Sequence, residues 1–73
     1  MRVCVFLADG FEEIEGLTVV DILRRAGVET RTVSITERRL VTGSHQILVT
    51  ADSCIKETDF SEAELLVLSL IHI

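Results

Sequence analysis

The stretch that decides the fold is residues 3–28, VCVFLADGFEEIEGLTVVDILRRAGV. Its first part, residues 3–8, is a continuous apolar run that is rich in β-branched residues and too short for a helix. Such a run is typical of a strand buried on both faces of a parallel sheet. Residues 11–26 then carry a helical pattern, and Gly27 supplies a helix stop. The stretch therefore predicts a strand followed directly by a helix.

The predicted helix is amphipathic. Acidic residues occupy its first turns, while Arg24 and Arg25 occupy the last, so the charges at both ends complement the helix dipole. Asp9 is followed three residues later by Glu12, a spacing that predicts a capping box at the helix start. The small and apolar residues that recur at helical spacing are Gly16, Val19, Val20, Leu23 and Gly27.

The remainder of the chain continues with strands and connections. Residues 28–35 are rich in β-branched side chains and predict a second strand, joined to the first by a right-handed crossover. Residues 40–41 and 47–50 flank a polar turn and predict a hairpin or a bent excursion from the sheet. Residues 52–61 are mainly polar and predict a connection, and residues 64–68 predict a final apolar strand.

One helix cannot cover both faces of a parallel sheet. The sequence therefore predicts an incomplete α/β domain, ordered β-α-β, hairpin, β, with one sheet face exposed. Such a face, next to the mainly apolar residues 69–73, favours aggregation, exchange of segments or recruitment of a partner.

Composition limits the classes of function. The 73 residues are 48% hydrophobic with a mean hydropathy of +0.45, which is more apolar than so small a domain readily buries. The net charge of −5 argues against non-specific binding to nucleic acid or to an anionic membrane. Neither a targeting segment nor a run of about 20 apolar residues is present.

Cysteine usage and motifs exclude further classes. Cys4 and Cys54 make no disulfide scaffold and match no zinc spacing, so the pattern indicates a reducing, cytoplasmic compartment and predicts no metal or cofactor. Residues 9–12 do not supply the Gly-x-Gly-x-x-Gly of a dinucleotide site, and no phosphate-binding loop follows. A phospho-receiver domain would need an acceptor aspartate at the end of a later strand, where Ser69 follows Leu68.

A family resemblance covers most of the chain. Residues 8–15, ADGFEEIE, followed by residues 20–28, VDILRRAGV, resemble the opening of the DJ-one/ThiJ/PfpI family, and the similarity continues through residues 41–45, 50–52 and 66–68. The resemblance implies a flavodoxin-like three-layer sandwich that is usually homodimeric. Family members include glyoxalases, protein deglycases, stress chaperones, and proteins labelled as thiazole monophosphate biosynthesis or intracellular protease-like. These activities share a nucleophilic cysteine.

The resemblance also implies roles for single residues. In the family the cysteine lies on a strand-to-helix elbow well downstream, and a glutamate of the first helix donates a hydrogen bond to its thiolate. Glu15 matches that glutamate, and a like charge with partial burial would keep its carboxyl protonated. His45 matches a position near the active-site pocket, and Arg25 one implicated in anion contacts around the dimer. Taken alone, these are a helix-terminus carboxylate, a turn residue and a helix-end residue.

The sequence departs from the family pattern after Leu68. In family members the final strand continues into Pro-Gly-Gly, whose amides help to form the oxyanion pocket, whereas Ser69 follows here. Residues 68–73, LSLIHI, resemble the translation of a transposon adapter used in sequencing libraries. We therefore interpret residues 1–68 as the N-terminal part of a family domain and residues 69–73 as read-through from a truncated gene.

Neither cysteine matches the family nucleophile. Cys4 lies within the first strand and is expected to be a small buried hydrophobe. Cys54 lies in the polar connection and is expected to be an exposed, silent thiol. His72 belongs to the tail and is assigned no role.

The resulting hypothesis is a fragment whose parent uses cysteine thiolate chemistry on small reactive carbonyl compounds or glycated proteins. Glu15 is the candidate thiolate partner, and Arg25 and His45 are candidate binding residues. The chain has no nucleophile with an adjacent base and oxyanion donors, so we expect it to be inactive alone. The alternative is a non-catalytic dimerisation or chaperone-like module that uses exposed apolar sheet.

Overall fold

The computed structural model describes residues 2–61 and 63–68, so the predicted read-through tail and His72 lie outside the described residues. The elements follow the predicted order β-α-β, hairpin, β, with a short strand and a 3-10 turn added where a plain connection was expected. Their bounds are β1 (Arg2–Leu7), α1 (Glu13–Arg25), β2 (Glu29–Ser34), β3 (Leu40–Thr42), β4 (Leu48–Thr50), β5 (Ser53–Cys54), η1 (Ile55–Glu57) and β6 (Leu65–Leu68).

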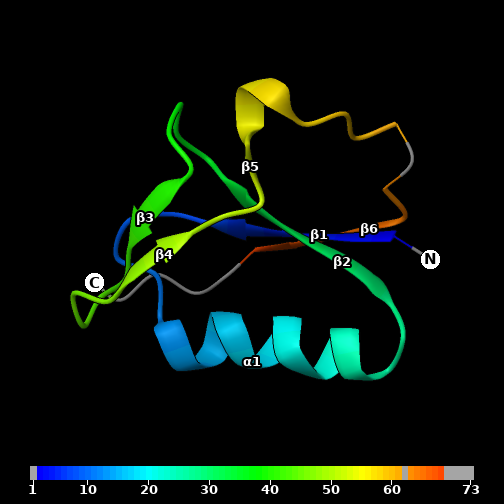
Figure 1. Ribbon diagram of the computed structural model, residues 1–73, viewed down its shortest axis with the longest axis horizontal. Helices are drawn as coiled ribbons and strands as arrows, with labels where there is room; N and C mark the ends of the chain where they lie inside the picture. Colours follow the sequence, from blue (N-terminus) through cyan, green and yellow to red (C-terminus); the bar gives the residue numbers. More distant parts are fainter. Residues whose placement is uncertain (1, 62, 69–73) are drawn as a thin grey trace.

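Four parallel strands form the main sheet, in the order β5-β2-β1-β6 (Figure 1). β1 is an interior strand, because Val5 pairs with Thr32 of β2 on one side and with Val67 of β6 on the other. The chain therefore places β2 beside β1 and later returns to add β6 at the opposite edge. β3 and β4 form a separate antiparallel hairpin. Both the parallel crossover and the hairpin confirm the prediction.

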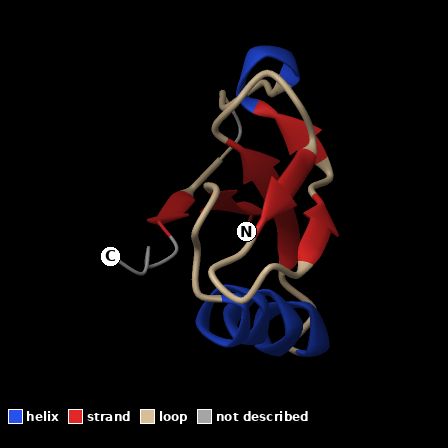
Figure 2. Cartoon of the chain, turned by 90° about the vertical axis from the view of Figure 1, so that its left-hand side faces the viewer, coloured by secondary structure: helices blue, strands red, loops and turns tan. Residues whose placement is uncertain are grey.

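Helix α1 covers one face of the sheet (Figures 1 and 2). Alternate side chains of β1 are buried on this face, and Gly16 and Val20 are the buried members of the predicted helical stripe. Burying an aliphatic side chain of this size contributes roughly 1.5–3 kcal/mol, so this layer supplies most of the apolar stabilisation. The buried core consists of Val3, Val5, Leu7, Phe11, Val20, Val41 and Ala51.

The second face of the sheet, which carries no helix, is covered to a greater extent than the sequence predicts. Cys4 is buried as expected, and the ring of Phe6 lies 5.6 Å from that of Phe60, which comes from the connection before β6. Cys54 is 7% exposed, so the expectation of an exposed thiol is wrong. It is buried because β5 adds to the edge of β2. Leu66, which pairs with Cys4, stays 56% exposed, so the expected bare face is limited to the β6 edge.

The two ends of α1 differ in how well the sequence predicted them. The helix starts at Glu13 rather than residue 11, because Phe11 is fully buried in the core. Asp9 makes no capping box; its carboxylate accepts a hydrogen bond from the Thr42 amide at 3.0 Å. Gly27 follows the helix with a φ of +79°, which confirms the predicted stop. Within the described part of the chain, no helix is long and apolar enough to cross a membrane.

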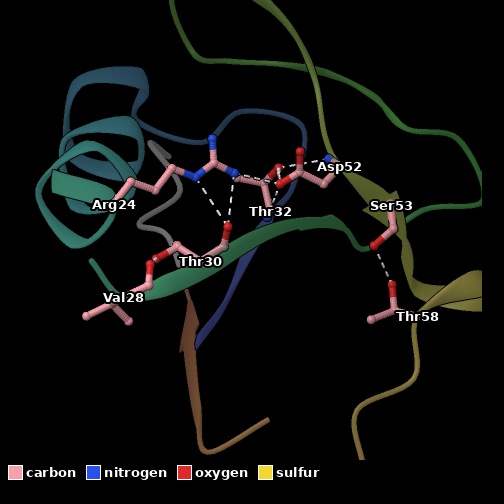
Figure 3. Close-up of polar contacts among 7 residues, drawn as sticks. All are labelled: Arg24, Val28, Thr30, Thr32, Asp52, Ser53 and Thr58. Carbon is pink, nitrogen blue, oxygen red and sulfur yellow. Dashed lines mark hydrogen bonds and ion pairs between the residues drawn. The ribbon is translucent and has the colours of Figure 1, made fainter. Parts of the chain in front are cut away.

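A polar network joins the end of α1 to β2 and to the segment after β4 (Figure 3). The Arg24 guanidinium donates to the Thr30 carbonyl and, at 2.8 Å, to the Asp52 carboxylate. Asp52 also accepts from the Thr32 amide at 2.9 Å, and its own amide donates to the Thr32 hydroxyl. Burial would raise the pKa of Asp52, but the bonds from Thr32 and the Arg24 charge outweigh it and lower the pKa.

We predict that Asp52→Ala lowers the free energy of unfolding by about 1–2 kcal/mol, because the buried Thr32 amide loses its acceptor. Urea denaturation followed by circular dichroism measures the change. Asp21→Ala is the matched control, since the Asp21–Arg25 pair is solvent-exposed and such pairs contribute about 0.3–0.5 kcal/mol. Equal losses in the two variants would contradict the prediction.

Candidate functional site

The strand order defines an edge where a ligand could bind. In open parallel sheets, ligands bind beyond the carboxyl ends of the strands, where the chain connections diverge to opposite sides. Here that point lies between β1 and β6, because β2 and β6 flank β1. The loop that follows β1 is fixed to β3, since Gly10 has a φ of +88° and its amide donates to the Thr42 carbonyl at 2.7 Å. This loop places the first turn of α1 at the same edge.

Glu13, the first residue of α1, joins the helix to the turn of the β3–β4 hairpin. Its side chain is buried, and the residue is 3% exposed. One carboxylate oxygen, Oε2, accepts hydrogen bonds from the amides of His45 at 2.7 Å and Ile47 at 3.4 Å. The other, Oε1, accepts from Nδ1 of the His45 ring at 2.9 Å. A methyl group added at Gly43 would overlap this carboxylate, so the turn and the helix fit closely.

The contact between Glu13 and His45 shifts the pKa of both groups. Burial would raise the pKa of Glu13, but bonds from His45, from its own backbone amide and from Ile47 outweigh burial and lower the pKa from 4.5 to about 2. The hydrogen bond to Glu13 and its negative charge raise the pKa of His45 above its usual 6.5. A carboxylate that is anionic at neutral pH therefore faces an imidazole that readily takes a proton.

Two further side chains complete what we call the Glu13 cluster, which consists of Glu12, Glu13, Ser44 and His45. The Ser44 hydroxyl lies 3.2 Å from Oε1 of Glu12, 3.3 Å from Oε1 of Glu13 and 3.1 Å from Nδ1 of His45. Two carboxylate oxygens and one ring nitrogen thus surround one hydroxyl group. The ligand atoms of Glu12, Glu13 and His45 all lie within 4.8 Å of one another.

The three residues singled out from the sequence have different surroundings. His45 belongs to the Glu13 cluster, and its side chain is largely exposed. Glu15 is exposed in the first turn of α1, two residues after Glu13. Arg25, at the other end of α1, pairs with Asp21 at 2.9 Å and is also exposed. The structure therefore brings His45 and the start of α1 together and leaves Arg25 apart from them.

Sequence reasoning missed Glu13 and Ser44. Glu13 shares the buried helical stripe with Gly16 and Val20, and an acidic residue on an apolar stripe is the signal that could have found it. Ser44 carries no such signal, because its neighbours come from α1, about thirty residues earlier in the chain. Cys4 and Cys54 are both free and buried, and neither belongs to the cluster.

The Glu13–His45 contact predicts a pH profile for stability. Because the folded pKa of Glu13 is lowered, its contribution is complete above pH 4.5 and is lost as the pH falls towards about 2. Because the pKa of His45 is raised, its contribution is complete below pH 6.5 and is lost as the pH rises through the folded value. The contribution of the pair is therefore expected to be largest between these limits.

Thermal denaturation across this pH range tests the profile. Glu13→Gln is expected to lower stability and to remove its dependence on pH at both the acidic and the basic side of the profile. Glu37→Gln, on an exposed carboxyl, is expected to keep both dependences. A wild-type chain whose His45 ring titrates at or below 6.5 by NMR would contradict the prediction.

Comparisons with known proteins agree with this architecture. The chain matches the model of the DJ-1/PfpI family over residues 1–69. No curated protein sequence matches it significantly. Among solved structures, it resembles oxidised DJ-1 of Toxoplasma gondii, with 30% identity and a TM-score of 0.90 over 96% of the chain. It also resembles a cysteine-to-alanine mutant of a DJ-1 superfamily protein from Salmonella typhimurium, with 37% identity and a TM-score of 0.90 over 96% of the chain.

Drosophila melanogaster DJ-1beta is a third neighbour, with 26% identity and a TM-score of 0.89 over 96% of the chain. The chain spans 38% of the length of each of these three proteins. The parallel sheet and the helix thus agree with the flavodoxin-like α/β fold of these neighbours. Since the family model matches nearly the whole sequence, the chain belongs to the DJ-1/PfpI family.

Proposed function

We propose that this chain supplies the carboxyl group of the first helix to a cysteine-thiolate site. The site would belong to a cytoplasmic parent protein that acts as a glyoxalase or protein deglycase. The substrates would be small reactive carbonyl compounds or glycated proteins. The observation that carries the proposal is the place of Glu15. It is exposed on the first turn of α1, which starts at the carboxyl edge of β1, next to the end of β6.

The chemistry follows from that position. A segment that continued from β6 would enter the same edge, and a cysteine on it would come close to the first turn of α1. A protonated carboxyl donates a stronger hydrogen bond to a thiolate than to a thiol. It therefore lowers the pKa of the thiol. The lowered pKa makes the sulfur anionic and nucleophilic at neutral pH, as attack on an aldehyde carbon requires.

A chimera tests this role of Glu15. Residues 2–68 would replace the matching segment of Drosophila DJ-1beta, whose remaining part supplies the rest of the fold. A hydrogen bond to a charged group contributes about 1.5–3 kcal/mol, so Glu15→Ala is expected to raise the pKa of the reactive thiol by about 1–2 units. The pH dependence of iodoacetamide alkylation measures this pKa, and methylglyoxal consumption should fall in parallel.

Glu37→Ala is the matched control in the chimera, because Glu37 is an exposed carboxyl that follows β2 instead of lying on α1, and it pairs with Lys56. The chain by itself is expected to consume no methylglyoxal. Equal thiol pKa values in the Glu15 and Glu37 variants, or turnover by the isolated chain, would refute the proposal.

A second candidate function, homodimerisation, is favoured by an exposed apolar surface on α1 and the hairpin. Ile14 is 80% exposed and Ile22 59% exposed, and a shallow groove of about 390 Å³ between α1 and the hairpin is lined by Ile14, Leu17 and Ile47. Ile14 lies four residues before the exposed Thr18, and Ile22 lies four residues after it. A two-fold axis at Thr18 would therefore place Ile14 against Ile22 of the partner subunit in an antiparallel helix pair.

Ile14→Asp tests the dimer by sedimentation equilibrium. The substitution is expected to convert a dimer to a monomer without loss of helix content, because Ile14 makes little contact within its own chain. Ile35→Asp is the matched control, since Ile35 is an exposed isoleucine that follows β2 instead of lying on α1. A monomeric wild-type chain, or equal behaviour of the two variants, would exclude this interface.

A further inference from the structure

The Glu13 cluster has the chemistry of a metal site, although the sequence spacing predicts none. We propose that Glu12, Glu13 and His45, together with the Ser44 hydroxyl, bind a divalent transition-metal ion of the zinc type. The ligand atoms would be one carboxylate oxygen from each glutamate and Nδ1 of the His45 ring, which lie within 4.8 Å of one another. The argument for this site does not rest on the proposed thiolate chemistry.

Four of the distances within the cluster are close to those of a tetrahedral ligand set. Zinc binds nitrogen and oxygen ligands at about 2.0–2.1 Å, so neighbouring ligands of a tetrahedral site lie about 3.3 Å apart. The Ser44 hydroxyl oxygen lies 3.2, 3.3 and 3.1 Å from the other three ligand atoms. Nδ1 of His45 and Oε1 of Glu13 are 2.9 Å apart. Small rotations of the Glu12, Ser44 and His45 side chains would therefore admit an ion among the four atoms.

The surroundings of Glu13 orient it for this purpose. Its Oε2 is already held by the amides of His45 and Ile47, so Oε1 is the atom that faces the other ligands. Gly43 lies against the carboxyl group and restricts its rotation. Outer contacts of this kind fix the ligands of metal sites in advance. Because Glu13 is buried in the apolar stripe of α1, the cluster differs from an ordinary group of exposed acidic residues.

The ligand types select the class of ion. Two carboxylates and one imidazole favour zinc and its neighbours among the transition metals, whereas magnesium and calcium prefer oxygen ligands alone. The two anionic ligands balance the charge of a divalent cation. On binding, the ion takes the place of the proton at Nδ1 of His45, and that proton leaves to solvent. The His45 side chain is largely exposed, so the ring can turn towards the ion.

Isothermal titration calorimetry with Zn²⁺ near neutral pH tests the site. We expect one Zn²⁺ per chain, with binding weakened at least about tenfold by His45→Ala and by Glu12→Gln. Neither substitution alters the buried Glu13, and circular dichroism checks that both variants fold. Glu37→Gln and His72→Ala are the carboxylate and imidazole controls and should bind as the wild type does. By NMR, Zn²⁺ should shift the ring protons of His45, and Mg²⁺ at the same concentration should not.

Two results would overturn the proposal. One is a wild-type chain that binds no Zn²⁺. The other is a His45→Ala variant with unchanged affinity, which would place the ion elsewhere in the chain. Since neither result depends on methylglyoxal turnover or on thiol reactivity, failure of this site would leave the proposed function of Glu15 untouched.

Discussion

Burial of β1 on both of its faces is the constraint on which the rest of the structure depends. A strand with parallel neighbours on each side has no polar face to offer to water, so each layer above and below it must be filled. Val3, Val5 and Leu7 require α1, and Cys4 and Phe6 require the segment that carries Phe60. The position of the helix, the long return to β6 and the pairing of β6 with β1 all follow from this one requirement.

The sequence predicted the elements whose signals are local. The apolar run of β1, the stripe of α1 and the glycine after it need no knowledge of distant residues, and each was found in place. The errors came from tertiary contacts. Phe11 is buried in the core instead of starting the helix, and Asp9 accepts a hydrogen bond from Thr42 instead of capping the helix. Cys54 is buried because β5 pairs with β2. No pattern of neighbouring residues encodes such pairings.

The candidate site was predicted in part for the same reason. His45 and Glu15 were identified by resemblance to the DJ-1/PfpI family, whereas Glu13, which accepts hydrogen bonds from His45 and Ile47, had to be seen in the fold. Three glutamates within one turn thus have three environments: Glu12 is half-buried at the cap, Glu13 is buried and held anionic, and Glu15 is exposed. Side chains of one type thus acquire different ionisation properties through burial and hydrogen bonding alone.

The pairing of β1 with β6 also bears on how the chain folds. Val3 pairs with Leu65, so this contact closes a loop that spans nearly the whole described chain, whereas β1, α1 and β2 are contiguous. Closing a long loop costs entropy before the contact repays it, and non-local strand pairing is slow. The β-α-β unit can therefore form while the chain is still being synthesised, and β6, an entirely apolar strand, joins β1 after that unit. During that interval the edge of β1 is open to strands of other chains.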